Sequence, residues 1–143
     1  MWMNESMAGR ITKLLCMGLF ITGAFLTPAT YANSADFKTG YRAYQRGDFA
    51  AAAKEWLALA EAGNTKAQYN VGILFDQGKG VQQDRAEAVS WWRRSAESGF
   101  RMAQHNLANA YIAGDGVEQS YKDAVHWLQR ASEAGLNRSR YTL

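Results

Sequence analysis

A 36-residue repeat is the feature that most restricts how this chain can fold. The phrase GKGVQQD at 78–84 returns as GDGVEQS at 114–120, and the same frame aligns Gly63 with Gly99 and Gly135 without a gap. Repeats of this length build arrays in which each unit buries its apolar face against the next unit. The sequence therefore predicts a solenoid of stacked helix pairs.

The first helix of each pair is expected to precede the glycine-rich turn. The segments TKAQYNVGILFDQ (65–77) and RMAQHNLANAYIA (101–113) carry apolar or small residues at helical spacing. Gly78 and Gly114 stand where a helix closes its last turn in the left-handed conformation. The doubled phrase is thus a helix-to-helix turn. A dinucleotide-binding loop would instead follow a strand and would need a third glycine.

The second helix of each pair begins after the turn. Asp84 and Ser120 are suited to cap it, and each has an acidic residue three positions later, the arrangement of a capping box. These helices are expected to end at Gly99 and Gly135. After Gly135 another helix is expected to start and stop within about two turns, and atypical terminal units of this kind cap solenoids.

Residues 1–32 have the layout of a secretory signal peptide. Arg10 and Lys13 precede the apolar run LLCMGLFITGAFL, and small residues follow up to Ala32. The run is shorter than the ~20 residues that a helix needs to span a bilayer, although a retained anchor stays an alternative. We expect cleavage after Ala32 and a periplasmic or secreted product without membrane insertion. Translation could begin at Met1 or at Met7.

Composition excludes several classes of function for the exported part. The chain has one cysteine, Cys16, which lies in the signal segment, so the mature chain would hold no disulfide and would depend on its core. Its net charge falls from +3 to +2 without the signal segment, too balanced to indicate nucleic-acid binding. His105 and His126 lack metal-ligand spacing, and no nucleophile motif is present. We expect no enzyme activity, no metal and no cofactor.

These segments resemble the Sel-one-like repeat (SLR) family, relatives of tetratricopeptide repeats. The resemblance is carried by KAQYNVGILFDQGKGVQQD, EAVSWWRRSAESG and MAQHNLANAYIAGDGVEQSYKDAVHWLQRASEAG. Ala108 departs from the family glycine of the first helix, and Glu55 replaces the first tryptophan. The resemblance implies an all-α, right-handed α-solenoid of antiparallel helix pairs whose concave face, lined mainly by the first helices, binds proteins.

The expected organisation is a signal peptide at 1–32 followed by a solenoid domain at 33–143. Within it, a tetratricopeptide-like first helix spans 36–48, repeats span 49–84 and 85–120, and a partial capping repeat spans 121–143. The four tryptophans of the repeat region, at 56, 91, 92 and 127, are expected to fill the core between layers.

The candidate binding surface is the stripe of the first helices opposite Gly72 and Ala108. This mixture of aromatic, aliphatic and polar residues suits a peptide or a partner helix. We expect an exported interaction module, an adaptor or scaffold in a bacterial envelope. A secreted effector or inhibitor of a target protein is the alternative, and a degenerate hydrolase a remote one. The stripe comprises Tyr41, Tyr44, Lys66, Tyr69, Ile73, Asp76, Met102, His105, Asn109 and Ile112.

Two parts of this surface have a competing interpretation. Ile73, Ile112 and Tyr44 could belong partly to the core between repeats. Asn70 and Asn106, which stand beside the stripe, could use their amides to satisfy backbone groups of the adjacent layer.

Overall fold

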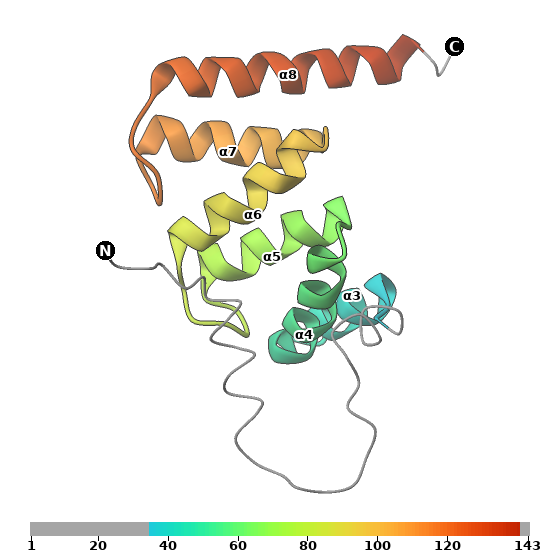
Figure 1. Ribbon diagram of the computed structural model, residues 1–143. Coiled ribbons are helices and arrows are strands. Elements are labelled where there is room, and N and C mark those ends of the chain that lie inside the picture. Colours follow the sequence, from blue (N-terminus) through green and yellow to red (C-terminus); the bar gives the residue numbers. More distant parts are fainter. Residues whose placement is uncertain (1–34, 141–143) are drawn as a thin grey trace, which may run out of the picture.

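The structure, a computed structural model, describes residues 35–140, with side chains up to Gly135. The expected signal peptide lies outside the described residues. Six helices occupy this range and follow one another as a stack from α3 to α8 (Figure 1). Their bounds are α3 Phe37–Gln45, α4 Phe49–Glu61, α5 Thr65–Gln77, α6 Arg85–Glu97, α7 Arg101–Ala113 and α8 Tyr121–Arg140.

Each helix packs chiefly against the helices before and after it in the chain. The extensive contacts join α3 to α4, α4 to α5, α5 to α6, α6 to α7 and α7 to α8. This nearest-neighbour pattern defines a solenoid, so the predicted all-α array is confirmed. The core runs along the stack as one cluster, and the four tryptophans at 56, 91, 92 and 127 are buried in it as predicted.

A tryptophan of the second helix lies directly on a glycine of the first helix in two of the three pairs. Trp92 Nε1 donates to the Tyr69 carbonyl (3.3 Å), and a Cβ added at Gly72 would lie 2.4 Å from the indole. Trp56 covers Gly40 in the same way and donates to the Phe37 carbonyl (3.3 Å). The glycines are therefore required by the close approach of a large ring.

The third pair changes both partners of this contact. Ala108 stands in the place of Gly72, and Leu128 stands one repeat after Trp92. A smaller side chain on the second helix thus accompanies the added methyl group on the first. The departure of Ala108 from the family pattern is explained by this exchange.

The glycine-rich turns join the layers. Gly78 (φ 66°) and Gly114 (φ 70°) end α5 and α7 in the left-handed conformation, which confirms the prediction. The second glycine of the turn is required for another reason, a close approach to the previous layer. A Cβ at Gly116 would lie 2.3 Å from the carbonyl oxygen of Arg85, in the first turn of α6. The turn after α7 therefore rests on the backbone of the previous layer.

The predicted capping boxes form only in part. The Asp84 carboxylate accepts from the amide of Glu87, and the Ser120 hydroxyl accepts from the amide three residues later, as expected. However, the Asp84 amide donates to the carbonyl of Phe75 (2.9 Å), and the Ser120 amide donates to the carbonyl of Tyr111 (3.0 Å). The end of the preceding helix supplies carbonyls that lack intrahelical donors. These carbonyls accept from the cap amides, in place of the acidic side chain of a complete capping box.

Buried glutamines, and not asparagines, satisfy the backbone of the neighbouring layer. Gln68 Nε2 donates to the carbonyl of Ala60, and Gln104 Nε2 donates to that of Ala96, each at 3.1 Å. These carbonyls belong to the last turns of α4 and α6, where intrahelical donors are missing. Each first helix is thereby fixed to the second helix before it.

The predicted helix end at Gly135 is wrong, because α8 continues through this residue to Arg140. Gly63 (φ 92°) and Gly99 (φ 86°) adopt the left-handed conformation after α4 and α6, whereas Gly135 is not among the glycines with positive φ. At the two earlier positions the next helix folds back, and its buried glutamine donates to a carbonyl of the helix just ended.

Candidate functional site

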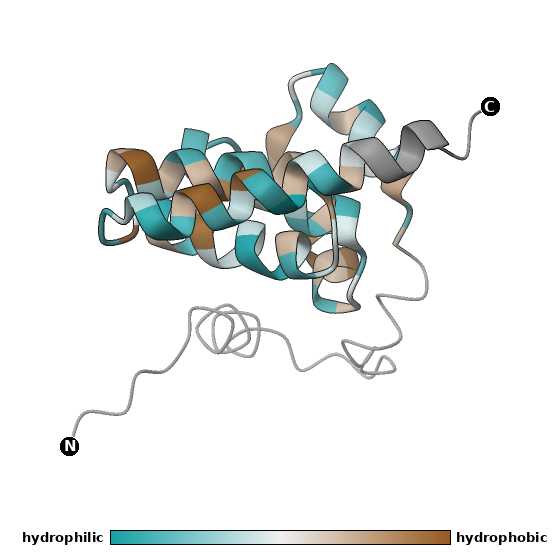
Figure 2. Ribbon diagram, turned by 90° about the horizontal axis from the view of Figure 1, so that it is seen from above, coloured by the Kyte–Doolittle hydropathy of each residue, from teal (hydrophilic) through white to brown (hydrophobic). Residues whose placement is uncertain are grey.

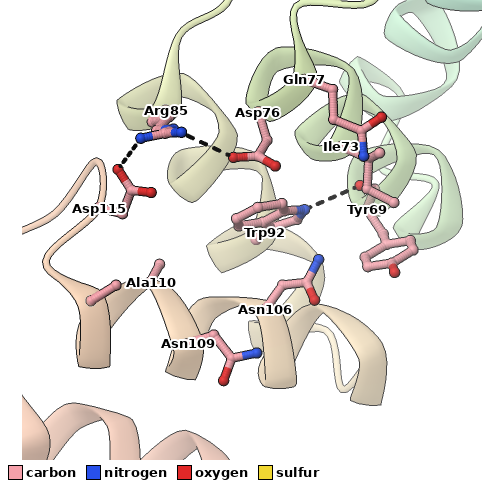
Figure 3. Close-up of a pocket in the computed structure, with 11 residues that line it drawn as sticks. Tyr69, Ile73, Asp76, Gln77, Arg85, Trp92, Asn106, Asn109, Ala110 and Asp115 are labelled. Atoms are coloured by element: carbon pink, nitrogen blue, oxygen red, sulfur yellow. Dashed lines mark hydrogen bonds and ion pairs between the residues drawn. The ribbon is translucent and has the colours of Figure 1, made fainter.

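A groove of about 440 Å³ lies between the first helices of two successive pairs, α5 and α7. α5 contributes Tyr69, Ile73, Asp76 and Gln77, and α7 contributes Asn106, Asn109, Ala110 and Ala113 (Figure 3). The members of each set lie three, four, seven or eight residues from its first member and therefore form one face of the helix. Residues from α6 and from the turn after α7 complete the lining: Arg85, Trp92 and Asp115.

Aromatic side chains stiffen one side of the groove. Trp92 comes from α6 and is held by its hydrogen bond to the Tyr69 carbonyl (Figure 3). The Tyr69 ring meets Phe100 edge to face, with 5.2 Å between centroids. Burial raises the pKa of the Tyr69 hydroxyl, and a hydrogen bond with Asn106 acts more weakly in the opposite direction. Tyr69 therefore packs partly on the core and also lines the groove.

An ionic cluster closes one end of the groove. Arg85, at the start of α6, lies between two carboxylates: its Nη1 is 2.8 Å from Asp115 and its Nε is 3.8 Å from Asp76 (Figure 3). All three side chains are substantially exposed, so the pairs orient the groups more than they stabilise the fold. The cluster leaves the groove with a net charge of −1.

The equivalent position one repeat earlier has different chemistry. Lys79 corresponds to Asp115 in the repeat frame, and its ammonium lies 5.5 Å from the ring centroid of Tyr44 and 5.0 Å from that of Phe49. Tyr44 also packs on Trp56, with 5.6 Å between ring centroids. The turn after α5 thus contacts the previous layer through a lysine on aromatic rings, whereas the turn after α7 makes the equivalent contact through an ion pair beside the groove.

The groove brings together four residues of the predicted stripe: Tyr69, Ile73, Asp76 and Asn109. The structure places the other six elsewhere. Tyr44 is half-buried in the aromatic cluster of α3 and α4, which matches its interpretation as core, and Ile73 also packs partly on the core. The remaining five are exposed and do not line the groove: Tyr41, Lys66, Met102, His105 and Ile112.

Sequence reasoning found only Asn109 of the α7 wall of the groove, because it assigned one stripe to every first helix. In a stack, one flank of a helix faces the layer before and the other faces the layer after. The predicted stripe of α5 therefore faces a neighbouring stripe of α7, which contains Asn106, Ala110 and Ala113. The fixed Gln104-x-Asn106 spacing was the available signal, since Gln104 marks the side that faces α6.

A second depression, of about 390 Å³, lies on α6 against the turn after α7. It includes Ser90, Arg93 and Val117. Arg93 donates to the Tyr111 hydroxyl (2.8 Å), and the Arg94 guanidinium lies 4.6 Å from the centre of the Trp91 ring. Both arginines are exposed and also contact aromatic side chains of the fold.

Within residues 35–140, no cluster of three or more histidine, cysteine, aspartate or glutamate side chains could hold a metal ion. None of the helices there has the length and hydropathy of a membrane-crossing segment.

Comparison with known proteins gives one family and several structural relatives. The Sel1 repeat model matches residues 65–100 and 101–136. A protective antigen of uropathogenic Escherichia coli strains that displays an SLR fold superimposes with a TM-score of 0.64 at 33% identity. A Sel1 repeat protein from Oxalobacter formigenes gives a TM-score of 0.64 at 30% identity.

These relatives are longer than the present chain. The match covers 76% of this chain and 23% of the Escherichia coli antigen, and 90% of this chain and 51% of the Oxalobacter protein. No curated protein matches the chain significantly.

Proposed function

The chain belongs to the Sel1 repeat family, and from that premise we propose that it is an exported adaptor or scaffold that holds a segment of a partner protein in the groove between α5 and α7. Sel1 repeats generally mediate protein–protein interactions. The observation that carries the proposal is the groove itself, which combines an aromatic wall, the half-buried Asn106 amide, the exposed Asn109 amide and an ionic end.

The lining favours a particular kind of segment. Asn106 and Asn109 lie one helical turn apart, and an amide side chain offers both donors and an acceptor, of which Asn106 uses one with Tyr69. They are therefore suited to the peptide groups of an extended chain, while Ile73 offers apolar contact. Because Asp76 and Asp115 outnumber Arg85, we expect the bound segment to present a basic or hydrogen-bond-donating side chain beside Asp76.

A catalytic role has little support in this groove. Arg85, Asp76 and Asp115 are engaged with one another, and the Tyr69 pKa is raised by burial, which disfavours its ionisation. A proton-transfer site would need a group poised to titrate near neutral pH. Binding without chemistry is the function that these side chains favour.

A pair of arginine substitutions tests the groove. Asn109→Arg places a long cation on the groove wall at an exposed position, and Ser90→Arg places the same side chain at an exposed position of the second depression, on α6. Partners captured from an envelope extract of the producing cells are identified by mass spectrometry and titrated against each variant. We expect Asn109→Arg to weaken capture about tenfold or more, with Ser90→Arg close to wild type.

Two results would contradict the groove assignment. Loss of capture in Ser90→Arg alone would place the partner on the second depression, around Arg93 and Arg94. Full capture by both variants would exclude both surfaces as the binding site of the partner. Because both positions are exposed, we expect each variant to keep its helices, and circular dichroism checks this.

Export is the second part of the proposal. The signal layout of residues 1–32 supports cleavage after Ala32 and a mature chain that begins at Asn33. Amino-terminal sequencing of the exported protein tests this, and a membrane-bound product that retains Met1 or Met7 would refute it. Fractionation then separates the two roles: retention in the periplasm favours an adaptor, and release into the medium favours an effector or inhibitor.

A further inference from the structure

α7 begins without the side-chain cap that the other described helices have. Asn64 caps α5, where its Oδ1 accepts from the amide of Ala67 (2.9 Å). The helices α3, α4, α6 and α8 each begin after an aspartate or a serine whose oxygen accepts from the first turn. Phe100 stands one repeat after Asn64, at the cap position of α7, and makes no such hydrogen bond. A phenylalanine needs another reason at this position, because the amides of the first turn are left without a side-chain acceptor.

The Phe100 ring contacts a residue that lines the groove. Its centroid lies 5.2 Å from that of Tyr69 with the two rings inclined at 62°, an edge-to-face pair. Phe100 also packs on the core, which restrains its own position. The Tyr69 hydroxyl is hydrogen-bonded with Asn106 on α7. Tyr69 comes from α5 and is therefore held, at its ring and at its hydroxyl, by residues at the start and in the middle of the facing helix.

The first helix pair shows another position for a ring at this site. Phe37 corresponds to Tyr69, because each lies three residues before a glycine and each carbonyl accepts from the indole that covers this glycine. Phe37 stacks on its indole, with 5.8 Å between the ring centroids of Phe37 and Trp56. The ring partner of Tyr69 is Phe100 instead, and the Tyr69 ring points away from the indole of Trp92 (Figure 3).

The position of this ring decides how much room the groove offers. Trp92 is 8% exposed and lines the groove, so a Tyr69 ring stacked on it would occupy part of the groove. Trp92 is also the largest apolar side chain of a mostly polar lining. Hydrophobic and hydrophilic segments alternate along the helices of the stack (Figure 2), so an apolar contact with a partner depends on single side chains.

We propose that Phe100 is a positioning residue of the groove: it holds the Tyr69 ring at the wall and off Trp92, and the missing cap of α7 is the consequence. This inference rests on the proposed function, because the groove is the surface assigned to the partner. Without the Phe100 ring, Tyr69 would stack on Trp92 as Phe37 stacks on Trp56, and the amide of Asn106 would lose its hydroxyl partner.

Nuclear Overhauser contacts between ring protons test the proposal without a partner, in the protein purified in the form that the cell produces. Phe100→Leu keeps an apolar side chain against the core and removes the ring. Contacts between the Tyr69 ring and the six-membered ring of Trp92 should then strengthen several-fold over the wild type. Phe100→Tyr keeps the ring and should retain the wild-type pattern. A Tyr69 ring that stays in place in Phe100→Leu would overturn the proposal.

Capture of the partner, identified as above by mass spectrometry, tests the link to function. We expect Phe100→Leu to weaken capture about five- to tenfold and Phe100→Tyr to stay within about twofold of the wild type. In a Tyr69→Ala background Phe100→Leu should have no further effect, because no ring remains to be displaced. A merely structural role of Phe100 would weaken capture in both backgrounds.

The two measurements separate the possible failures. Loss of capture with an unmoved Tyr69 ring would overturn the positioning role alone. A ring that moves without loss of capture would overturn the groove as the partner site. If Phe100→Leu loses its helical circular dichroism, Phe100→Asn provides the same test, because it supplies α7 with the cap that Asn64 gives to α5.

Discussion

The contact between Gly72 and Trp92 gives the sharpest test of the packing. A methyl group at position 72 would lie 2.4 Å from two atoms of the indole, Cδ1 and Nε1. Favourable contacts between nonbonded heavy atoms need about 3.5 Å, so the ring must move by about 1 Å. Trp92 is buried and its Nε1 is committed to the Tyr69 carbonyl, so the ring has no free direction in which to yield.

The cost of Gly72→Ala follows from these terms. Overpacking a buried site costs about 1–3 kcal/mol, and a weakened indole hydrogen bond adds about 1 kcal/mol. Alanine recovers about 0.5–1 kcal/mol through its higher helix propensity. We therefore expect Gly72→Ala to lower the free energy of unfolding by about 1–3 kcal/mol.

The third layer of the same chain predicts a rescue. There, Ala108 and Leu128 replace the glycine and the tryptophan. In a Trp92→Leu background the methyl group at position 72 meets no indole, so only the propensity gain remains. Gly72→Ala should then stabilise the variant by about 0.5–1 kcal/mol, although Trp92→Leu itself is destabilising through the lost burial.

The assay is a double-mutant cycle by urea unfolding, followed by helical circular dichroism. The sign of the Gly72→Ala effect should reverse between the two backgrounds, which corresponds to a coupling of about 1.5–4 kcal/mol. Ala108→Gly is the matched control and should cost about 1 kcal/mol in the wild type, since its layer has leucine. Equal effects of Gly72→Ala in both backgrounds would refute the contact as the reason for glycine.

Two further predictions concern the turn and the groove. Gly116→Ala should lower the free energy of unfolding by about 2 kcal/mol or more, and clearly more than Gly114→Ala, because its Cβ would lie 2.3 Å from the Arg85 carbonyl oxygen while the nearest atom at Gly114 is 3.2 Å away; equal losses in urea would contradict this. Burial raises the pKa of Tyr69 in the folded chain, so the unfolded chain releases this proton first and stability should fall as pH rises above about 10. Tyr69→Phe should remove that part of the alkaline loss in pH-dependent melting, and an unchanged profile would speak against it.

The fold was predictable because the sequence signals that determine it are local and recur at a fixed interval. Gly78 and Gly114 end their helices as expected, and Asp84 caps the next helix through its side chain. Each of these features depends on residues within one turn of each other, so spacing alone indicates them. Repetition of the same signals at a fixed interval then made the stacked arrangement the only consistent interpretation.

The groove was less predictable, because it depends on how two helices from different layers face each other. Spacing indicates that Tyr69 and His105 are equivalent, but it cannot say that one lines a groove while the other is exposed outside it. The predicted helix end at Gly135 was wrong for a related reason. A glycine permits the left-handed turn without requiring it, and at Gly99 the turn occurs together with a buried Gln104 that joins the next helix to α6.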